Sequence, residues 1–140
     1  MIRPVLVLVG LSAAFLMVNS MVGYHQVYGV LYGAFALMAI MVSLTFLWLW
    51  VRRATPLASG MFFGWAGAAG VMGWWWSYNQ FENPSWMIEN PFLFVLLALY
   101  FVGAILHFQV IWQSFGIKSR TYLAPVVGSV VVSVLLQLTL

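Results

Sequence analysis

Five long apolar stretches, separated by short polar connections, make up almost the whole chain. They cover approximately residues 4–22, 27–51, 57–77, 91–114 and 121–140. Each is long enough, at about 20 residues, to cross the roughly 30 Å hydrocarbon core of a bilayer as an α-helix. Helix-breaking pairs follow two of them, Thr55-Pro56 after the second and Phe115-Gly116 after the fourth. The pattern predicts an all-α integral membrane protein, a bundle of five transmembrane helices in one membrane domain over residues 1–140.

The longest polar segment, residues 78–90, is predicted to be an outer interfacial loop between the third and fourth spans. The sequence Glu-Asn-Pro occurs in it at positions 82–84. The same sequence occurs again at positions 89–91, where the loop meets the fourth span. Asparagine is a favoured N-cap, and proline suits the first position of a helix. We therefore expect Asn83 to begin a short helical turn on the membrane surface and Asn90 to cap the fourth span.

The composition excludes a soluble domain. Hydrophobic residues make up 65% of the chain and charged residues only 5%, with a mean hydropathy of +1.05, whereas a soluble domain carries about 25% charged residues. The predicted surroundings are therefore the lipid bilayer and other integral membrane subunits. The five basic residues are scattered and form no basic patch, which argues against nucleic acid as a partner. The absence of cysteine excludes disulfides and thiolate metal sites.

The charged residues divide between the two sides of a five-span chain. If the spans alternate in direction, all basic residues fall on one side and both acidic residues on the other. The basic residues are Arg3, Arg52, Arg53, Lys118 and Arg120, and the acidic ones are Glu82 and Glu89. The positive-inside rule then predicts a cytoplasmic N-terminus and a C-terminus outside. The expected location is a multi-pass position in a bacterial or archaeal inner membrane or in an organelle membrane.

Small residues are predicted to form the packing faces of the helices. Glycine costs about 1 kcal/mol in a soluble helix, but within a bilayer it lets two backbones approach closely. Three of the glycines in the third span share one face, because successive residues turn by about 100°. The predicted packing residues are Gly29, Gly33, Gly60, Gly64, Gly67 and Gly128.

The fourth span contains the one histidine predicted to lie within the membrane, His107. Gly103 stands four residues earlier with Ala104 beside it, and this small-x-x-x-His pattern resembles haem- and chlorophyll-ligating helices, including those of light-harvesting polypeptides, over about ten residues. The resemblance implies that the imidazole ligates the metal of a haem or a chlorophyll-type pigment whose macrocycle lies against Gly103 and Ala104. Two other interpretations stay open: a neutral imidazole hydrogen-bonded to a neighbouring helix, and a role with a quinone or a proton.

A second candidate site lies on the predicted outer side, where His25 could meet Glu82 and Glu89. Imidazole and carboxylate are suitable ligands for zinc or copper. The alternative is an interfacial histidine and two solvated acidic residues.

Function is constrained mainly by what the predicted spans lack. No Asp, Glu, Lys or Arg lies inside them, which argues against an ion-coupled transporter. No hydrolase triad, phosphate loop or HExxH motif occurs. We therefore expect a non-catalytic subunit of a larger membrane complex of respiratory, photosynthetic or oxidase type. One alternative is a haem- or chlorophyll-binding electron-transfer or light-harvesting component that uses His107. Another is a small transporter or sensor of an apolar ligand that uses the outer loop and the Trp74–Trp76 end of the third span.

Overall fold

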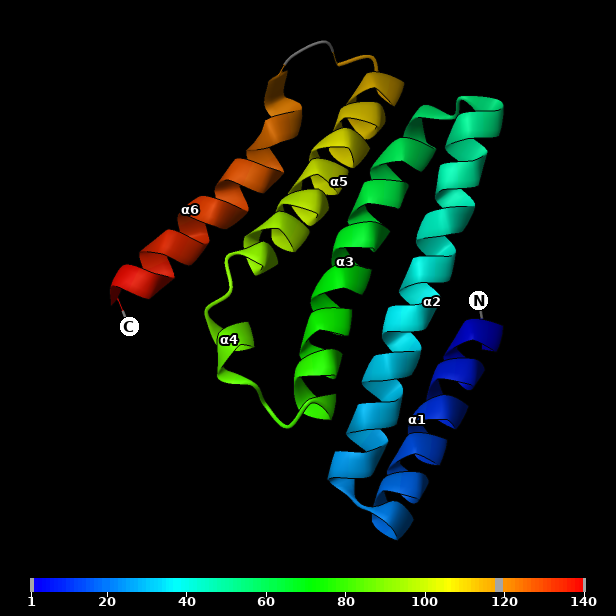
Figure 1. Ribbon diagram of the computed structural model, residues 1–140. Coiled ribbons are helices and arrows are strands. Elements are labelled where there is room, and N and C mark those ends of the chain that lie inside the picture. The colour runs from blue at the N-terminus through cyan, green and yellow to red at the C-terminus, as the bar shows by residue number, and fades with distance from the viewer. Residues whose placement is uncertain (1, 118–119, 140) are drawn as a thin grey trace.

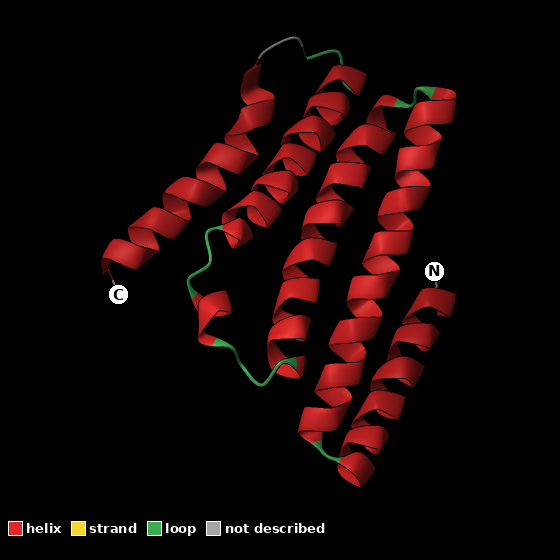
Figure 2. Cartoon of the chain, viewed as in Figure 1, coloured by secondary structure: helices red, strands yellow, loops and turns green. Residues whose placement is uncertain are grey.

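The computed structural model describes residues 2–117 and 120–139, and every regular element in this part of the chain is helical. Five long helices run alternately in opposite directions, and one short turn, α4, lies between the third and fourth of them (Figures 1 and 2). The elements are α1 (Ile2–Val22), α2 (Tyr24–Arg53), α3 (Pro56–Gln80), α4 (Ser85–Ile88), α5 (Phe92–Ser114), the 3-10 turn η1 (Arg120–Leu123) and α6 (Ala124–Thr139). The predicted all-α fold is confirmed.

Four segments of the described chain are long and apolar enough to cross a membrane. They are Ile2–Val22, Tyr24–Arg53, Ser85–Ser114 and Thr121–Thr139. The fifth long helix, α3, has 25 residues and no charge, but no long stretch of it reaches the hydropathy of these four segments. Length and composition alone therefore assign a span to four of the five predicted stretches, as expected of a multi-pass membrane protein.

The most buried part of the molecule is the unit formed by α2, α3 and α5, in which α3 packs against both of the others. The buried residues are almost all small. They are Gly33, Ala36, Ala39 and Ser43 on α2, Ala58, Gly60, Gly67 and Ala69 on α3, and Gly103 on α5. Ser43 links two of these helices, because its Oγ donates a hydrogen bond to the carbonyl oxygen of Phe62 at 3.1 Å. Close backbone approach, rather than large interlocking side chains, holds this unit together.

The first and last helices lie at the two sides of this unit and contribute no buried residue. A turn at Gly23, where φ is 97°, reverses the chain between α1 and α2. At 1.5 Å per residue α1 is about 32 Å long and α2 about 45 Å. The N-terminus is therefore level with the middle part of α2 in Figure 1, and α1 covers only part of its neighbour.

The predicted breaks after the second and fourth stretches are confirmed. Ala54 has the left-handed conformation (φ 47°) directly after α2, and Pro56 stands at the start of α3. Gly116, with φ of 72°, follows the end of α5. At the start of the fourth span Asn90 Oδ1 accepts a hydrogen bond from the backbone N–H of Phe92 at 2.9 Å, but the N-cap residue of α5 is Pro91, one position later than predicted.

The start of the short interfacial helix was predicted wrongly. The turn α4 begins at Ser85, whereas Glu82 and Asn83 both have positive φ, 58° and 59°. An N-cap residue needs an extended conformation, which Pro84 has and Asn83 does not. Asparagine instead tolerates the left-handed conformation that turns the chain after α3. The turn α4 is tied to α3 because Trp74 Nε1 donates to the carbonyl oxygen of Met87 at 3.2 Å.

Candidate functional site

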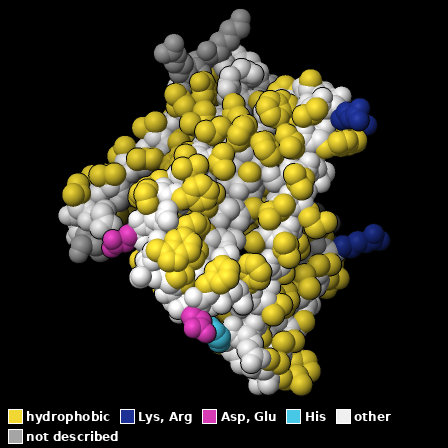
Figure 3. Space-filling model, in the orientation of Figure 1, with side chains coloured by type: hydrophobic (Ala, Val, Ile, Leu, Met, Phe, Trp, Pro, Cys, Tyr) yellow, Lys and Arg dark blue, Asp and Glu magenta, His cyan; other side chains and the backbone are white. Residues whose placement is uncertain are grey.

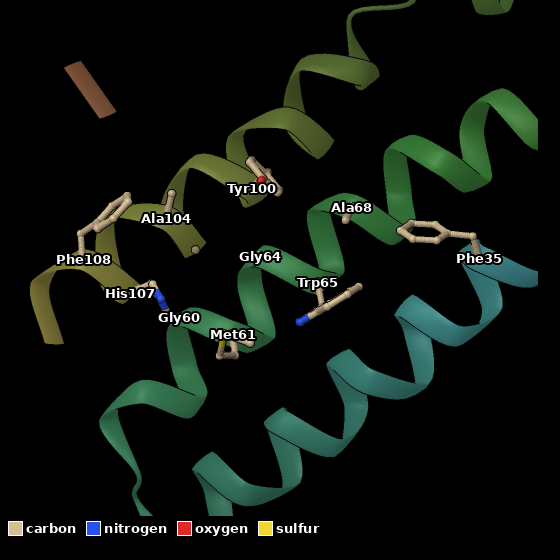
Figure 4. A pocket seen from close by; sticks show the side chains of 11 residues that line it. Phe35, Gly60, Met61, Gly64, Trp65, Ala68, Tyr100, Ala104, His107 and Phe108 are labelled. Atoms are coloured by element: carbon tan, nitrogen blue, oxygen red, sulfur yellow. The ribbon is translucent and has the colours of Figure 1, made fainter. Parts of the chain in front are cut away.

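A groove of about 440 Å³ lies along the contact between α3 and α5 and reaches α2 at one end (Figure 4). Four aromatic side chains line it: Phe35 from α2, Trp65 from α3, and Tyr100 and Phe108 from α5. His107 lines it as well, with its ring nitrogens turned towards α3 in Figure 4. The groove is therefore mainly apolar and has one imidazole in its wall.

Four glycines, here called the glycine seam, bring α3 and α5 together beside this groove: Gly60, Gly64, Gly67 and Gly103. A Cβ atom placed on Gly60 would lie 2.8 Å from the backbone nitrogen of His107, and one on Gly67 would lie 2.5 Å from that of Tyr100. A Cβ on Gly103 would collide with the backbone of Gly64. No side chain fits at these three positions, so the seam fixes where the backbone of His107 lies.

The other glycines that the sequence assigns to packing have different surroundings. A Cβ on Gly33 would lie 2.7 Å from the indole of Trp76, and one on Gly29 would lie 3.7 Å from the side chain of Gln80. Both contacts join α2 to the C-terminal half of α3. Gly128 on α6 has nothing within 4 Å of such an atom. The packing glycines therefore include both contacted and open positions.

The surface of Gly103, on which a macrocycle was predicted to lie, is covered by α3. Gly103 is buried against the backbone of α3, at Gly60 and Gly64, whereas Ala104 lines the groove. The sequence pattern shows that Gly103 and His107 share a helix face, but it does not show that another helix covers that face. A flat tetrapyrrole therefore has no access to the surface of Gly103.

The imidazole of His107 has no hydrogen-bond partner among the described residues. Its Nδ1 atom is buried and unpaired, and its nearest ring neighbour is Phe108, edge-on at 6.1 Å between centroids. The hydrogen bond to a neighbouring helix that the sequence analysis left open is thus not formed in the described chain. Nε2 is not among the buried unpaired atoms, and His107 lines the groove, so Nε2 is the nitrogen that can meet a molecule there.

This environment does not fit metal ligation by His107. A histidine that binds a metal through one nitrogen almost always donates the other N–H to a carboxylate, a carbonyl or water. Ligation through Nε2 would require a proton on Nδ1, and the described residues offer that proton no acceptor. Together with the covered face of Gly103, this argues against a haem or chlorophyll at this position.

A second groove, of about 630 Å³, lies between the N-terminal part of α2 and the C-terminal end of α3. Its lining is more polar and includes His25, Gln26, Asn79 and Gln80, with Trp76 among them. It lies at the end of the molecule near α4. Such a lining suits the boundary between lipid and water, where tryptophan and amide side chains can contact lipid head groups.

The predicted metal ligands do not form a site. Among the described residues no three His, Asp or Glu side chains come together in a way that could hold a metal ion. His25 is exposed in the first turn of α2, whereas Glu82 and Glu89 stand on either side of α4. The buried Met87 anchors α4 between these two acidic residues. In Figure 3 one acidic side chain lies beside a histidine, and the other lies apart from both.

Asn19 is a polar residue of interest that the sequence analysis did not single out. It is the least exposed residue of α1, and its Oδ1 atom is buried with no hydrogen-bond partner among the described residues. The sequence could have identified this residue, because it is the one asparagine within the first apolar stretch. An amide in a membrane helix commonly bonds to another helix.

The described chain is an α-helical protein with four segments suited to cross a membrane. Its glycine-rich helix, α3, lies at the centre. No protein-family model, no curated protein and no solved structure matches this chain. Helix packing and the groove at His107 are therefore the observations from which a function is inferred.

Proposed function

We propose that the chain is a non-catalytic integral membrane subunit of a larger complex of respiratory, photosynthetic or oxidase type, and that α1 and α6 contact its neighbours. A difference between glycines carries the proposal. Gly60, Gly67 and Gly103 leave no room for a Cβ atom, whereas nothing lies within 4 Å of such an atom on Gly10 or Gly128.

The difference matters because glycine is unfavourable in a helix without a close neighbour. It costs about 1 kcal/mol relative to alanine, and in a bilayer lipid tails give apolar side chains no reason to associate. Close backbone contact offsets that cost within the glycine seam. Gly10 and Gly128 have no such contact within the described part of the chain, so helices of other subunits are the proposed source. Small residues extend the face at Gly10, with Ala13 and Ala14 next to it on α1.

We also propose that α3 crosses the membrane, which gives five spans with the N-terminus in the cytoplasm. The helix is about 37 Å long, carries no charge and packs between α2 and α5, both of which can span. Arg52 and Arg53 end α2 on the side of the molecule where α5 also ends (Figure 1), while Glu82 and Glu89 flank α4 at the other end. This arrangement satisfies the positive-inside rule.

Single-cysteine labelling tests the topology, because the natural chain contains no cysteine. Thr55→Cys, between α2 and α3, should react with a membrane-impermeant maleimide only from the cytoplasmic side. Ser85→Cys, in α4, should react only from the outer side. Labelling of both positions from one side would contradict a membrane-spanning α3.

Substitution of the open glycines tests the subunit role. The protein is extracted from its native membrane in a mild detergent, and the mass of the assembly is measured by native mass spectrometry. Gly10→Leu and Gly128→Leu should release the chain from larger partners, because leucine prevents close approach at those faces. Val9→Leu and Val127→Leu, at exposed neighbouring positions, are the matched controls and should not. A natural chain that is monomeric, or that assembles only with copies of itself, would contradict the proposal.

A further inference from the structure

We propose that the groove between α3 and α5 binds a membrane-soluble quinone, one ring carbonyl of which accepts a hydrogen bond from the Nε2–H group of His107. This goes beyond the subunit role and does not depend on it. Three features of the groove carry the inference: the tautomer that the surroundings of His107 favour, the flat aromatic side chains of the lining, and the depth of the groove along α5.

The surroundings of Nδ1 decide which nitrogen carries the proton of neutral His107. Nδ1 is buried without a partner, so a proton there would be an unsatisfied buried N–H donor, which is rarer in proteins than an under-satisfied acceptor. The favoured tautomer therefore leaves Nδ1 as a bare acceptor and puts the proton on Nε2. The groove is thereby offered a hydrogen-bond donor, and its ligand must supply an acceptor such as a carbonyl oxygen.

The lining specifies the rest of the ligand. A volume of about 440 Å³ is within the range of small-molecule sites, which is roughly 300–1,000 Å³. Aromatic faces at Trp65, Tyr100 and Phe108 favour a flat ring, which can stack on them or meet their edges. No charged side chain lines the groove, so an anionic ligand would have no counter-charge there. A neutral, planar, carbonyl-bearing ring satisfies all of these requirements.

The position of His107 distinguishes a quinone from the ester carbonyls of ordinary phospholipids. His107 lies seven residues before Ser114, the last residue of α5, and therefore about 10 Å inside that end of the helix. Ester groups sit in the interfacial layer outside the hydrocarbon core. A quinone ring moves within the core and can reach this depth without drawing a head group into lipid.

The experiment measures quinone binding by the full chain in phosphatidylcholine nanodiscs. The probe is decylubiquinone, and saturable quenching of tryptophan fluorescence gives Kd as a mole fraction of lipid. His107→Leu removes the donor and should raise Kd about tenfold, the loss expected for a strong neutral hydrogen bond. His107→Gln places an amide N–H near the position of Nε2 and should keep Kd within about threefold of the natural chain.

Three further variants locate the site. Ala104→Phe fills the groove and should abolish saturable quenching, whereas Ala98→Phe, the same change at an exposed position of α5 outside the groove, should leave it unchanged. His25→Leu removes the only other histidine and should also have no effect. Circular dichroism and thermal unfolding of each variant separate loss of binding from loss of fold.

Several results would overturn the inference. Absence of saturable quenching in the natural chain would do so directly, as would equal Kd values for the natural chain and His107→Leu. Loss of binding in both His107→Leu and His107→Gln would show that the imidazole lone pair, not the N–H donor, is required. Repeating the titration in ether-linked phosphatidylcholine tests lipid carbonyls as the occupant. A quinone Kd that is unchanged supports the quinone site, and one that falls severalfold identifies ester lipids as the natural ligand.

Discussion

The glycine seam and the open glycines of α1 and α6 use the same residue in opposite circumstances. In the seam, a Cβ atom added to Gly60, Gly67 or Gly103 would clash with the backbone of the facing helix. A Cβ atom added to Gly10 or Gly128 would face open space. The comparison teaches that a glycine in a membrane helix does not by itself show that another helix of the same chain packs against it. The seam has its partners within the described chain, and the proposed subunit role assigns the partners of the faces at Gly10 and Gly128 to other subunits.

The largest expected effect is at the seam. Gly103→Ala should destabilise the fold by about 1–3 kcal/mol, the usual cost of forcing extra volume into a packed interface, because its Cβ would collide with the backbone of Gly64, which cannot rotate away. Unfolding of the purified chain in mixed micelles, as the fraction of denaturing detergent is raised, measures the change. An unaffected unfolding free energy would mean that α3 and α5 do not pack as closely as in this structure.

A smaller loss is expected where the partner is a side chain. In Gly33→Ala the new methyl group would meet the indole of Trp76, 2.7 Å from two of its atoms, but a side chain can shift where a backbone cannot. We expect a loss of about 1 kcal/mol, at the low end of the range for overpacking. Combining it with Trp76→Leu should remove most of that loss, and a double-mutant cycle with no coupling energy would argue against the contact.

The link between α2 and α3 through Ser43 should contribute less again. Ser43→Ala removes the hydrogen bond to the carbonyl oxygen of Phe62 and should cost about 0.6 kcal/mol, the mean value for such bonds between membrane helices. Ser59→Ala is the matched control, because Ser59 bonds only to the carbonyl of Pro56 in its own helix and should change stability little. Equal effects from the two variants would show that the bond to Phe62 adds nothing.

The sequence predicted the helices well because the length and composition of each apolar stretch determine them. It predicted poorly which helix faces pack together, because that depends on how two helices are aligned with each other. Thr55-Pro56 and Asn90 act through local geometry, which can be read from the chain. The burial of Gly103 by α3 and the unpaired Nδ1 of His107 depend on which helix lies opposite, and no spacing within one helix specifies that. Hydropathy is even misleading here, since the one long helix that is not apolar enough to count as a membrane span, α3, is the one packed on both sides.

The smallest loss of stability in the isolated chain, and the sharpest contrast with the seam, is expected for Gly128→Ala. The added Cβ meets nothing within 4 Å, and alanine is the better helix former by up to about 1 kcal/mol. The purified chain should therefore be unchanged or slightly more stable, the opposite sign to Gly103→Ala in the same unfolding assay. In the native membrane, if α6 lies against another subunit through this glycine, the same methyl group should weaken the assembly. A substitution that stabilises the chain alone but weakens the complex would separate the two roles of glycine, and one that destabilises the isolated chain would show that α6 already has a partner within it.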